Sequence, residues 1–137
     1  MNFLIRSIIS IGCGIAIGKE RKKHDKSGGS RTMAIICFSA NLIAILTQQI
    51  ALLNPVTHNF TRLMAYTIAG ISFIGNGVIM KNEGNVEGLT TASSLLACVI
   101  IGFCIGLGFY IYGIISAILV FLILESKYIK IRRISKE

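Results

Sequence analysis

The chain has 137 residues, of which 53% are hydrophobic and only 15% are charged. A soluble domain is usually about a quarter charged, so this composition excludes a disordered chain and argues against a water-soluble domain. The net charge of +8 comes from basic residues that flank long apolar runs, as in membrane proteins with basic cytoplasmic loops. We therefore expect one membrane domain and no nucleic-acid partner.

The apolar runs predict membrane-spanning helices, because a span needs about 20 mostly apolar residues. In chain order they are residues 1–18, 33–53, 63–80 and 89–124. The last run would be ~54 Å long as one helix, whereas the hydrocarbon core is ~30 Å thick. Glycine turns a chain readily, and Gly106 and Gly108 lie near its middle. We therefore divide it into 89–107 and 109–124, which makes five spans.

The distribution of basic residues predicts the orientation. With five spans, residues 19–32, 81–88 and 125–137 share one side and hold 12 of the 14 basic residues. That side is expected to be cytoplasmic, with the N-terminus outside. Four spans would separate the basic clusters, and a cleaved signal peptide is disfavoured because the first cluster follows its apolar run. The expected fold is an all-α, polytopic transmembrane helix bundle.

We place the transmembrane domain at residues 1–126 and a basic cytoplasmic tail at 127–137. Isoleucines alternate with basic residues in the tail, so we expect it to lie on the membrane surface beside anionic lipid.

The sequence offers little that points to catalysis or metal binding. The four cysteines lie inside predicted spans without zinc-site spacing, and His24 and His58 stand isolated in predicted loops. We expect the cysteines to be small packing residues and the histidines to be solvated. No nucleophile–base pair or phosphate-binding loop is visible, so we predict neither an enzyme nor a metal or other cofactor.

Several glycines have the spacing that allows helices in lipid to approach closely. Two pairs are four residues apart, and a third group lies on the third predicted span; the residues are Gly14, Gly18, Gly102, Gly106, Gly70, Gly75 and Gly77. We expect them to form helix–helix contacts rather than to line a permeation path.

Polar side chains inside predicted spans are costly unless satisfied. The candidates for a functional role are Asn76, Thr90, Thr91 and Ser93. Asn76 lies between two glycines, so it either faces a cavity or makes an interhelical hydrogen bond. No acidic residue lies deep in a span, which makes a carboxylate-lined cation site hard to build.

Charges are denser at the predicted cytoplasmic rim. Glu20 and Arg21 end the first span, and Arg31 starts the second after a short loop. Either Glu20 pairs with Arg31 in an ordered ion-pair network, or the loop is solvated and only fixes orientation. Arg62 marks the start of the third helix on the outer side.

Five motifs in order resemble the membrane domain of the MgtC/SapB family. The stretch 14–21 (GIAIGKER) is similar to its glycine-rich span ending in Glu-Arg, and 29–32 (GSRT) to its Gly-x-Arg-Thr. Residues 70–79 (GISFIGNGVI) and 86–93 (VEGLTTAS) resemble two further stretches. The fifth match is the Gly-x-x-x-Gly-x-Gly-x-Tyr run that ends at Tyr110.

The chain departs from the family pattern at identifiable positions. Asn76 stands where the family usually has Ala, and Leu96 where Trp is common. The acidic residue often found before the position of Arg62 is absent. We also expect the protein to lack the soluble C-terminal domain of the virulence-associated members.

The resemblance implies a prokaryotic plasma-membrane protein associated with growth at low magnesium. Some members are thought to act on the membrane ATP synthase rather than to carry magnesium. Our leading hypothesis is a non-enzymatic modulator of magnesium or membrane-energy homeostasis. Its expected partners are membrane lipid and either a membrane protein such as the ATP synthase or further copies of itself. The alternative is a small oligomeric Mg²⁺ or cation transporter or channel.

Overall fold

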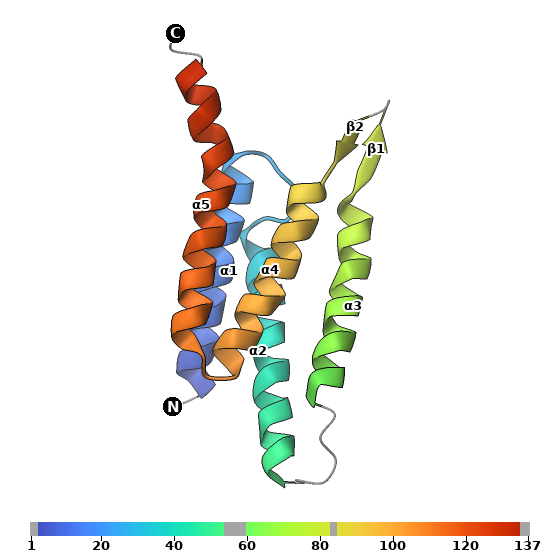
Figure 1. The fold of residues 1–137 in the computed structure, drawn as a ribbon, viewed down its shortest axis with the longest axis vertical. Helices are drawn as coiled ribbons and strands as arrows, with labels where there is room; N and C mark the ends of the chain where they lie inside the picture. The colour runs from blue at the N-terminus through green and yellow to red at the C-terminus, as the bar shows by residue number, and fades with distance from the viewer. Residues whose placement is uncertain (1–2, 54–59, 83–84, 135–137) are drawn as a thin grey trace.

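The computed structural model describes residues 3–53, 60–82 and 85–134. These form five helices, in the order α1 (Phe3–Lys23), α2 (Ser30–Leu53), α3 (Phe60–Val78), α4 (Leu89–Gly106) and α5 (Tyr110–Ile134). An antiparallel hairpin of β1 (Met80–Asn82) and β2 (Asn85–Glu87) joins α3 to α4 (Figure 1). The five predicted helical segments are confirmed. The sequence did not predict this hairpin, because strands of three residues are too short to show a periodic pattern.

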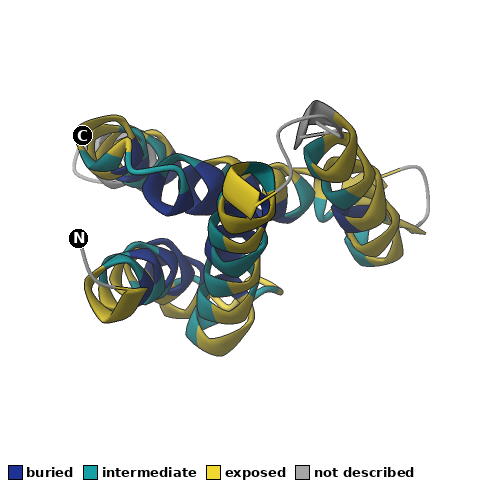
Figure 2. Cartoon of the chain, turned by 90° about the horizontal axis from the view of Figure 1, so that it is seen from below, coloured by how far each residue is buried: buried dark blue, intermediate teal, exposed yellow. Residues whose placement is uncertain are grey.

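Four helices, α1, α2, α4 and α5, pack together, while α3 lies to one side against α4 (Figure 2). The core forms where α4 crosses the others, and its largest fully buried apolar side chains are Ile17, Met33, Leu95, Ile101, Ile105 and Val99. Two of the cysteines, Cys37 and Cys98, are also fully buried there. All four cysteines are free thiols.

Two helices pack closely on α2 through glycines. A Cβ atom at Gly14 of α1 would lie 2.6 Å from the carbonyl oxygen of Met33, and one at Gly106 of α4 would lie 2.5 Å from that of Asn41. A Cβ at Gly18 would meet the backbone of Ser30, and one at Gly102 would meet the carbonyl of Cys37. The backbones therefore approach at distances that larger residues would prevent.

The glycines of α3 are placed differently. A Cβ at Gly75 would make an ordinary contact, 3.5 Å from the Cβ of Ala92. A Cβ at Gly70 or Gly77 would meet nothing within 4 Å among the described residues. Ile71 and Gly75 are the buried residues described on this helix. One face of α3 is thus glycine-rich and uncovered.

The long apolar run is broken where two glycines predicted a turn. Gly108 adopts φ +95°, the Phe109 N–H donates to the Cys104 carbonyl over 2.8 Å, and the Gly108 N–H donates to the Ile105 carbonyl over 3.1 Å. This pair of bonds is a Schellman motif, which satisfies the last carbonyls of α4 and reverses the chain into α5.

The surface and the helix lengths suit a membrane. Among the described helices, α2 and α4 are long and apolar enough to cross one, and α5 contains the shorter apolar stretch Tyr110–Ser126. Every helix exposes large apolar side chains, which would be unfavourable over so much of a water-soluble surface. The number of spans and their orientation stay predictions.

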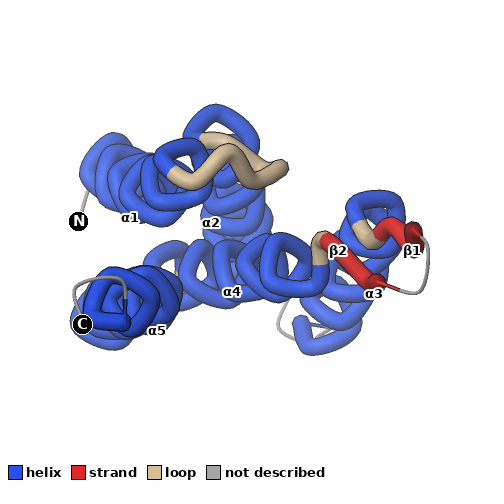
Figure 3. Tube along the Cα trace, turned by 90° about the horizontal axis from the view of Figure 1, so that it is seen from above, coloured by secondary structure: helices blue, strands red, loops and turns tan. Residues whose placement is uncertain are grey.

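One end of the bundle collects the segments that were expected to share a side. The α1–α2 loop and the hairpin lie there (Figure 3), and α5 runs past them. The expected tail begins inside α5, which continues to Ile134. The side chains from residue 127 onward lie outside the described part, so their placement beside lipid stays a prediction.

Candidate functional site

Buried charges gather where the end of α1 meets the start of α4 and the end of α5. Glu20 is 2% exposed and Arg21 is 4% exposed. We call the group the rim cluster; its members are Glu20, Arg21, Lys23, His24, Thr91 and Glu125. Such charges are rarely buried without partners, so their contacts determine what this end of the bundle can do.

Arg21 joins α1 to α4. Its Nη2 donates a hydrogen bond to Thr91 Oγ1 over 3.0 Å, and Ser27 Oγ donates to the same oxygen over 3.4 Å. The other terminal nitrogen of Arg21, Nη1, lies 3.6 Å from Glu20 Oε2. The guanidinium therefore connects a helix end, the following loop and the first turn of α4.

The Glu20 carboxylate lacks hydrogen bonds. Its side chain has no exposed surface, and neither oxygen has a hydrogen-bond partner among the described residues. The groups of opposite charge near it are Arg21 and, when protonated, His24, whose Nε2 lies 3.9 Å from Glu20 Oε1. A buried carboxylate without hydrogen bonds is energetically costly, so Glu20 retains unused capacity to bind a cation.

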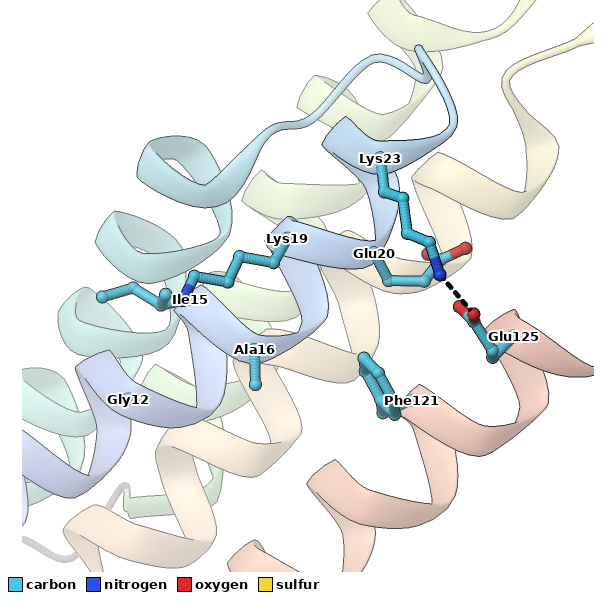
Figure 4. Close-up of a pocket in the computed structure, with 8 residues that line it drawn as sticks. All are labelled: Gly12, Ile15, Ala16, Lys19, Glu20, Lys23, Phe121 and Glu125. Carbon is cyan, nitrogen blue, oxygen red and sulfur yellow. Dashed lines mark hydrogen bonds and ion pairs between the residues drawn. The ribbon is translucent and has the colours of Figure 1, made fainter.

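Glu125 connects α5 to the cluster. Lys23 Nζ lies 2.6 Å from Glu125 Oε1 (Figure 4), and His24 Nε2 lies 3.7 Å from Glu125 Oε2. The hydrogen bond from Lys23 holds the pKa of the Glu125 carboxyl below its ordinary value. Because the Lys23 side chain is 63% exposed, this pair is accessible from solvent.

Local backbone structure positions the cluster. The Lys26 N–H donates to the Arg21 carbonyl over 3.0 Å, the Asp25 N–H donates to the Lys22 carbonyl over 3.2 Å, and Asp25 has φ 51°. This second Schellman motif turns the chain back across α4. A Cβ at Gly28 would then lie 2.9 Å from Thr91 Cγ2. The basic last turn of α1 also suits the negative end of the helix dipole.

A cavity of about 380 Å³ lies between α1 and α5 beside the rim cluster (Figure 4). Small residues on α1 face Phe121 of α5 there, and the lining residues are Gly12, Ile15, Ala16, Lys19, Glu20, Lys23, Phe121 and Glu125. The cavity thus has an apolar floor and a charged upper wall.

A groove between α1 and α2, of about 430 Å³, carries Arg31. It is otherwise almost wholly apolar, with Ser30 beside Arg31; the other lining residues are Ile11, Ile15, Ala34, Ile35 and Phe38. Arg31 is exposed.

An ion pair between Glu20 and Arg31 was one of the two alternatives for this rim, and the described contacts of Glu20 do not include it. Among the described residues no ion pair joins them, and the acidic group instead lies beside Arg21. The reason is rotational: Gly18 faces α2, and Glu20, two residues later, lies about 200° around the helix. Its side chain therefore points away from α2.

Of the predicted intramembrane polar residues, Thr91 is buried in the rim cluster. Asn76, Thr90 and Ser93 are exposed, at the end of α3 and the start of α4. The Ser93 hydroxyl donates to the Leu89 carbonyl over 2.9 Å, within its own helix. Neither described cavity is lined by any of these four residues.

Arg62 is exposed near the start of α3. Its guanidinium carbon lies 5.8 Å from the centroid of the Tyr66 ring. This is a cation–π contact within one helix, so Arg62 makes no described bond to another element.

Sequence reasoning missed two residues. His24 was expected to be solvated, whereas it lies between Glu20 and Glu125; its spacing of four residues from Glu20 was the available signal. Arg6, the charge inside the first apolar run, donates from Nη1 to the Gly106 carbonyl over 2.7 Å and to Gln48 Oε1 over 3.1 Å.

Comparison with known proteins identifies relatives. The chain is 36% identical to YhiD of Escherichia coli K12, named "putative magnesium transporter", over 128 residues, or 90% of this chain and 59% of YhiD. It is 29% identical to MgtC of Salmonella typhimurium over 118 residues, or 86% of this chain and 49% of MgtC. The chain thus spans about half to three-fifths of the length of these curated relatives.

No solved structure matches the chain significantly. The model of the MgtC family, in contrast, matches residues 8–131. That range includes the whole rim cluster and all the close-packed glycines of α1 and α4. The chain therefore belongs to the MgtC family.

Proposed function

We propose that this chain is a five-span, non-enzymatic membrane protein that modulates magnesium or membrane-energy homeostasis by binding a membrane partner through α3. One relative, YhiD, is named for magnesium transport, and this name and the family membership support the link to magnesium. The N-terminus is proposed to lie outside, with the rim cluster at the cytoplasmic face of a prokaryotic plasma membrane.

The uncovered face of α3 is the observation that carries the proposal. Gly70 and Gly77 leave open space beside the helix, and the exposed amide of Asn76 lies between Gly75 and Gly77. Glycines let a second helix approach closely in lipid, where a polar side chain can form an interhelical hydrogen bond. The face is therefore suited to a helix of a partner protein. The ATP synthase is the first partner to test, because the family resemblance suggests it.

Growth at low magnesium tests this proposal. A strain lacking the chain should grow poorly there, and the wild-type chain should restore growth. Gly77→Leu should fail to restore it, because the larger side chain fills the approach to α3. Ser39→Leu, which adds bulk at an exposed position of α2, should restore it. Equal rescue by both variants would count against α3 as the binding face.

A second candidate is an oligomeric Mg²⁺ or cation transporter. The favouring observation is that Asn76, near the end of α3, and Thr90, at the start of α4, are exposed polar residues. These two helix ends adjoin, because a Cβ at Gly88 would meet the Val78 carbonyl, so copies meeting there would bring several amides and hydroxyls together. Magnesium flux into proteoliposomes distinguishes the two candidates. Flux that Asn76→Leu removes would support transport, and no flux from folded protein would favour the modulator.

A further inference from the structure

Three side chains of the kinds that bind metal ions meet in the rim cluster. Glu20 and His24 lie one turn apart on α1, and Glu125 reaches them from α5. One ligand atom from each lies within 4.8 Å of the other two. Ligand atoms around a tetrahedral ion with bonds of 2.0–2.1 Å are roughly 3.4 Å apart. The measured separations from His24 Nε2, 3.7 and 3.9 Å, need only small side-chain rotations.

The state of Glu20 is a second observation that points to a ligand. Its side chain is fully buried, and both oxygens lack hydrogen bonds among the described residues. The nearest Arg21 nitrogen, at 3.6 Å, is beyond hydrogen-bond distance and the same guanidinium already bonds Thr91. A divalent cation would satisfy this carboxylate directly.

We propose that Glu20, His24 and Glu125 bind a divalent transition-metal ion of the zinc class, and that Lys23 takes its place when no ion is bound. An imidazole with two carboxylates suits Zn²⁺, whereas Mg²⁺ prefers oxygen ligands in octahedral geometry. The site is therefore distinct from any magnesium role of the chain and does not rest on the function proposed above.

Lys23 makes the exchange of cations feasible. Its ammonium lies 2.6 Å from Glu125, but its side chain is 63% exposed, so it can move into solvent without losing a buried contact. Arg21 keeps its bond to Thr91 during this exchange. An ion would then replace the Lys23–Glu125 pair as the connection between α1 and α5.

Titration of the 137-residue chain in lipid nanodiscs tests the site, with Zn²⁺ binding followed by calorimetry and Co²⁺ binding by its visible absorption. We expect one ion per chain and no displacement by a hundredfold excess of Mg²⁺. His24→Gln and Glu125→Gln should weaken Zn²⁺ binding by at least about tenfold, as loss of even an outer-shell partner does. Lys23→Gln should tighten binding, because it removes the competing cation.

Lys22→Gln is the matched control for Lys23→Gln. It removes the same charge from the neighbouring position, but Lys22 is exposed and makes no ion pair among the described residues. If Lys22→Gln and Lys23→Gln increased the affinity for Zn²⁺ equally, the proposed exchange between the ion and Lys23 would be overturned. Absence of Zn²⁺ binding, or binding unchanged by both His24→Gln and Glu125→Gln, would overturn the site. His24 and Glu125 are only partly buried, so their variants test the site even if Glu20→Gln folds poorly.

Discussion

Arg6 of α1 donates a hydrogen bond over 2.7 Å to the carbonyl oxygen of Gly106, at the end of α4. Carbonyls in the last turn of a helix lack intrahelical partners and carry the negative end of its dipole. The same guanidinium binds Gln48 of α2 and lies over the Tyr110 ring at 5.8 Å. A charge inside an apolar run is thus in contact with three other helices.

Replacing Arg6 should therefore destabilise the bundle. Arg6→Met keeps much of the side-chain length but removes a charged hydrogen bond, which is worth about 1.5–3 kcal/mol. We expect a lower thermal unfolding temperature in detergent. Arg62→Met is the control, because Arg62 is exposed and contacts Tyr66 in its own helix. An equal loss in both variants would contradict the role of Arg6.

Replacing Arg21 alone should lower the free energy of unfolding more than replacing both Arg21 and Glu20. Arg21→Met leaves the buried Glu20 carboxylate without its nearest cation, and breaking a buried pair typically costs about 3–5 kcal/mol. Adding Glu20→Gln should recover part of that loss. A double-mutant cycle of unfolding free energies measures the coupling; strictly additive losses would show that the two groups do not interact.

Glycines on different helices should differ in their response to alanine. Gly102→Ala would push a Cβ into the Cys37 carbonyl and to 2.8 Å from the Ala40 Cβ, and overpacking of this kind costs about 1–3 kcal/mol. The Cβ of Gly70→Ala meets nothing within 4 Å among the described residues, and the substitution gains helix propensity of up to ~1 kcal/mol. The thermal unfolding temperature of Gly102→Ala should be lower than that of the wild type. That of Gly70→Ala should be equal to the wild-type value or higher.

The Lys23–Glu125 pair should make stability depend on acidic pH. Lys23 lowers the pKa of Glu125 in the folded protein, so the pair stabilises the fold above the ordinary carboxyl pKa of about 4.3. This stabilisation disappears as the pH falls through the lowered pKa. The unfolding temperatures of wild type and Lys23→Gln should differ at pH 7, and this difference should shrink as the pH falls below about 4.3. A difference that does not shrink on acidification would assign the effect to another contact.

The sequence predicted the helices better than it predicted their contacts. Run length and the glycines around residue 107 located five helices and the turn between α4 and α5, because both signals are local. The partner of Glu20 depends instead on how α1 is rotated against its neighbours. Because α1 is apolar on most faces, its sequence does not show which face contacts which neighbour. Its rotation is known only from the contacts of Gly14 and Gly18 with α2.

The glycines of α3 illustrate the same limit. They make α3 glycine-rich like α1 and α4, yet a Cβ at Gly70 or Gly77 would meet nothing within 4 Å among the described residues. Spacing shows that a close approach is sterically allowed, but the identity of the approaching helix is a tertiary property. His24 was missed for a related reason, since one of its neighbours, Glu125, is distant in the sequence.

The contacts of Arg6 and Arg21, both on α1, have a further mechanical consequence. Arg6 binds the end of α4 and Arg21 binds its first turn; fifteen residues separate the arginines, and fifteen separate Thr91 from Gly106. Both intervals are ~22 Å of helix, so the antiparallel α1 and α4 are held at matching heights. Sliding one along the other would break both attachments. In a thinner or thicker bilayer, this pair would therefore adapt by tilting together.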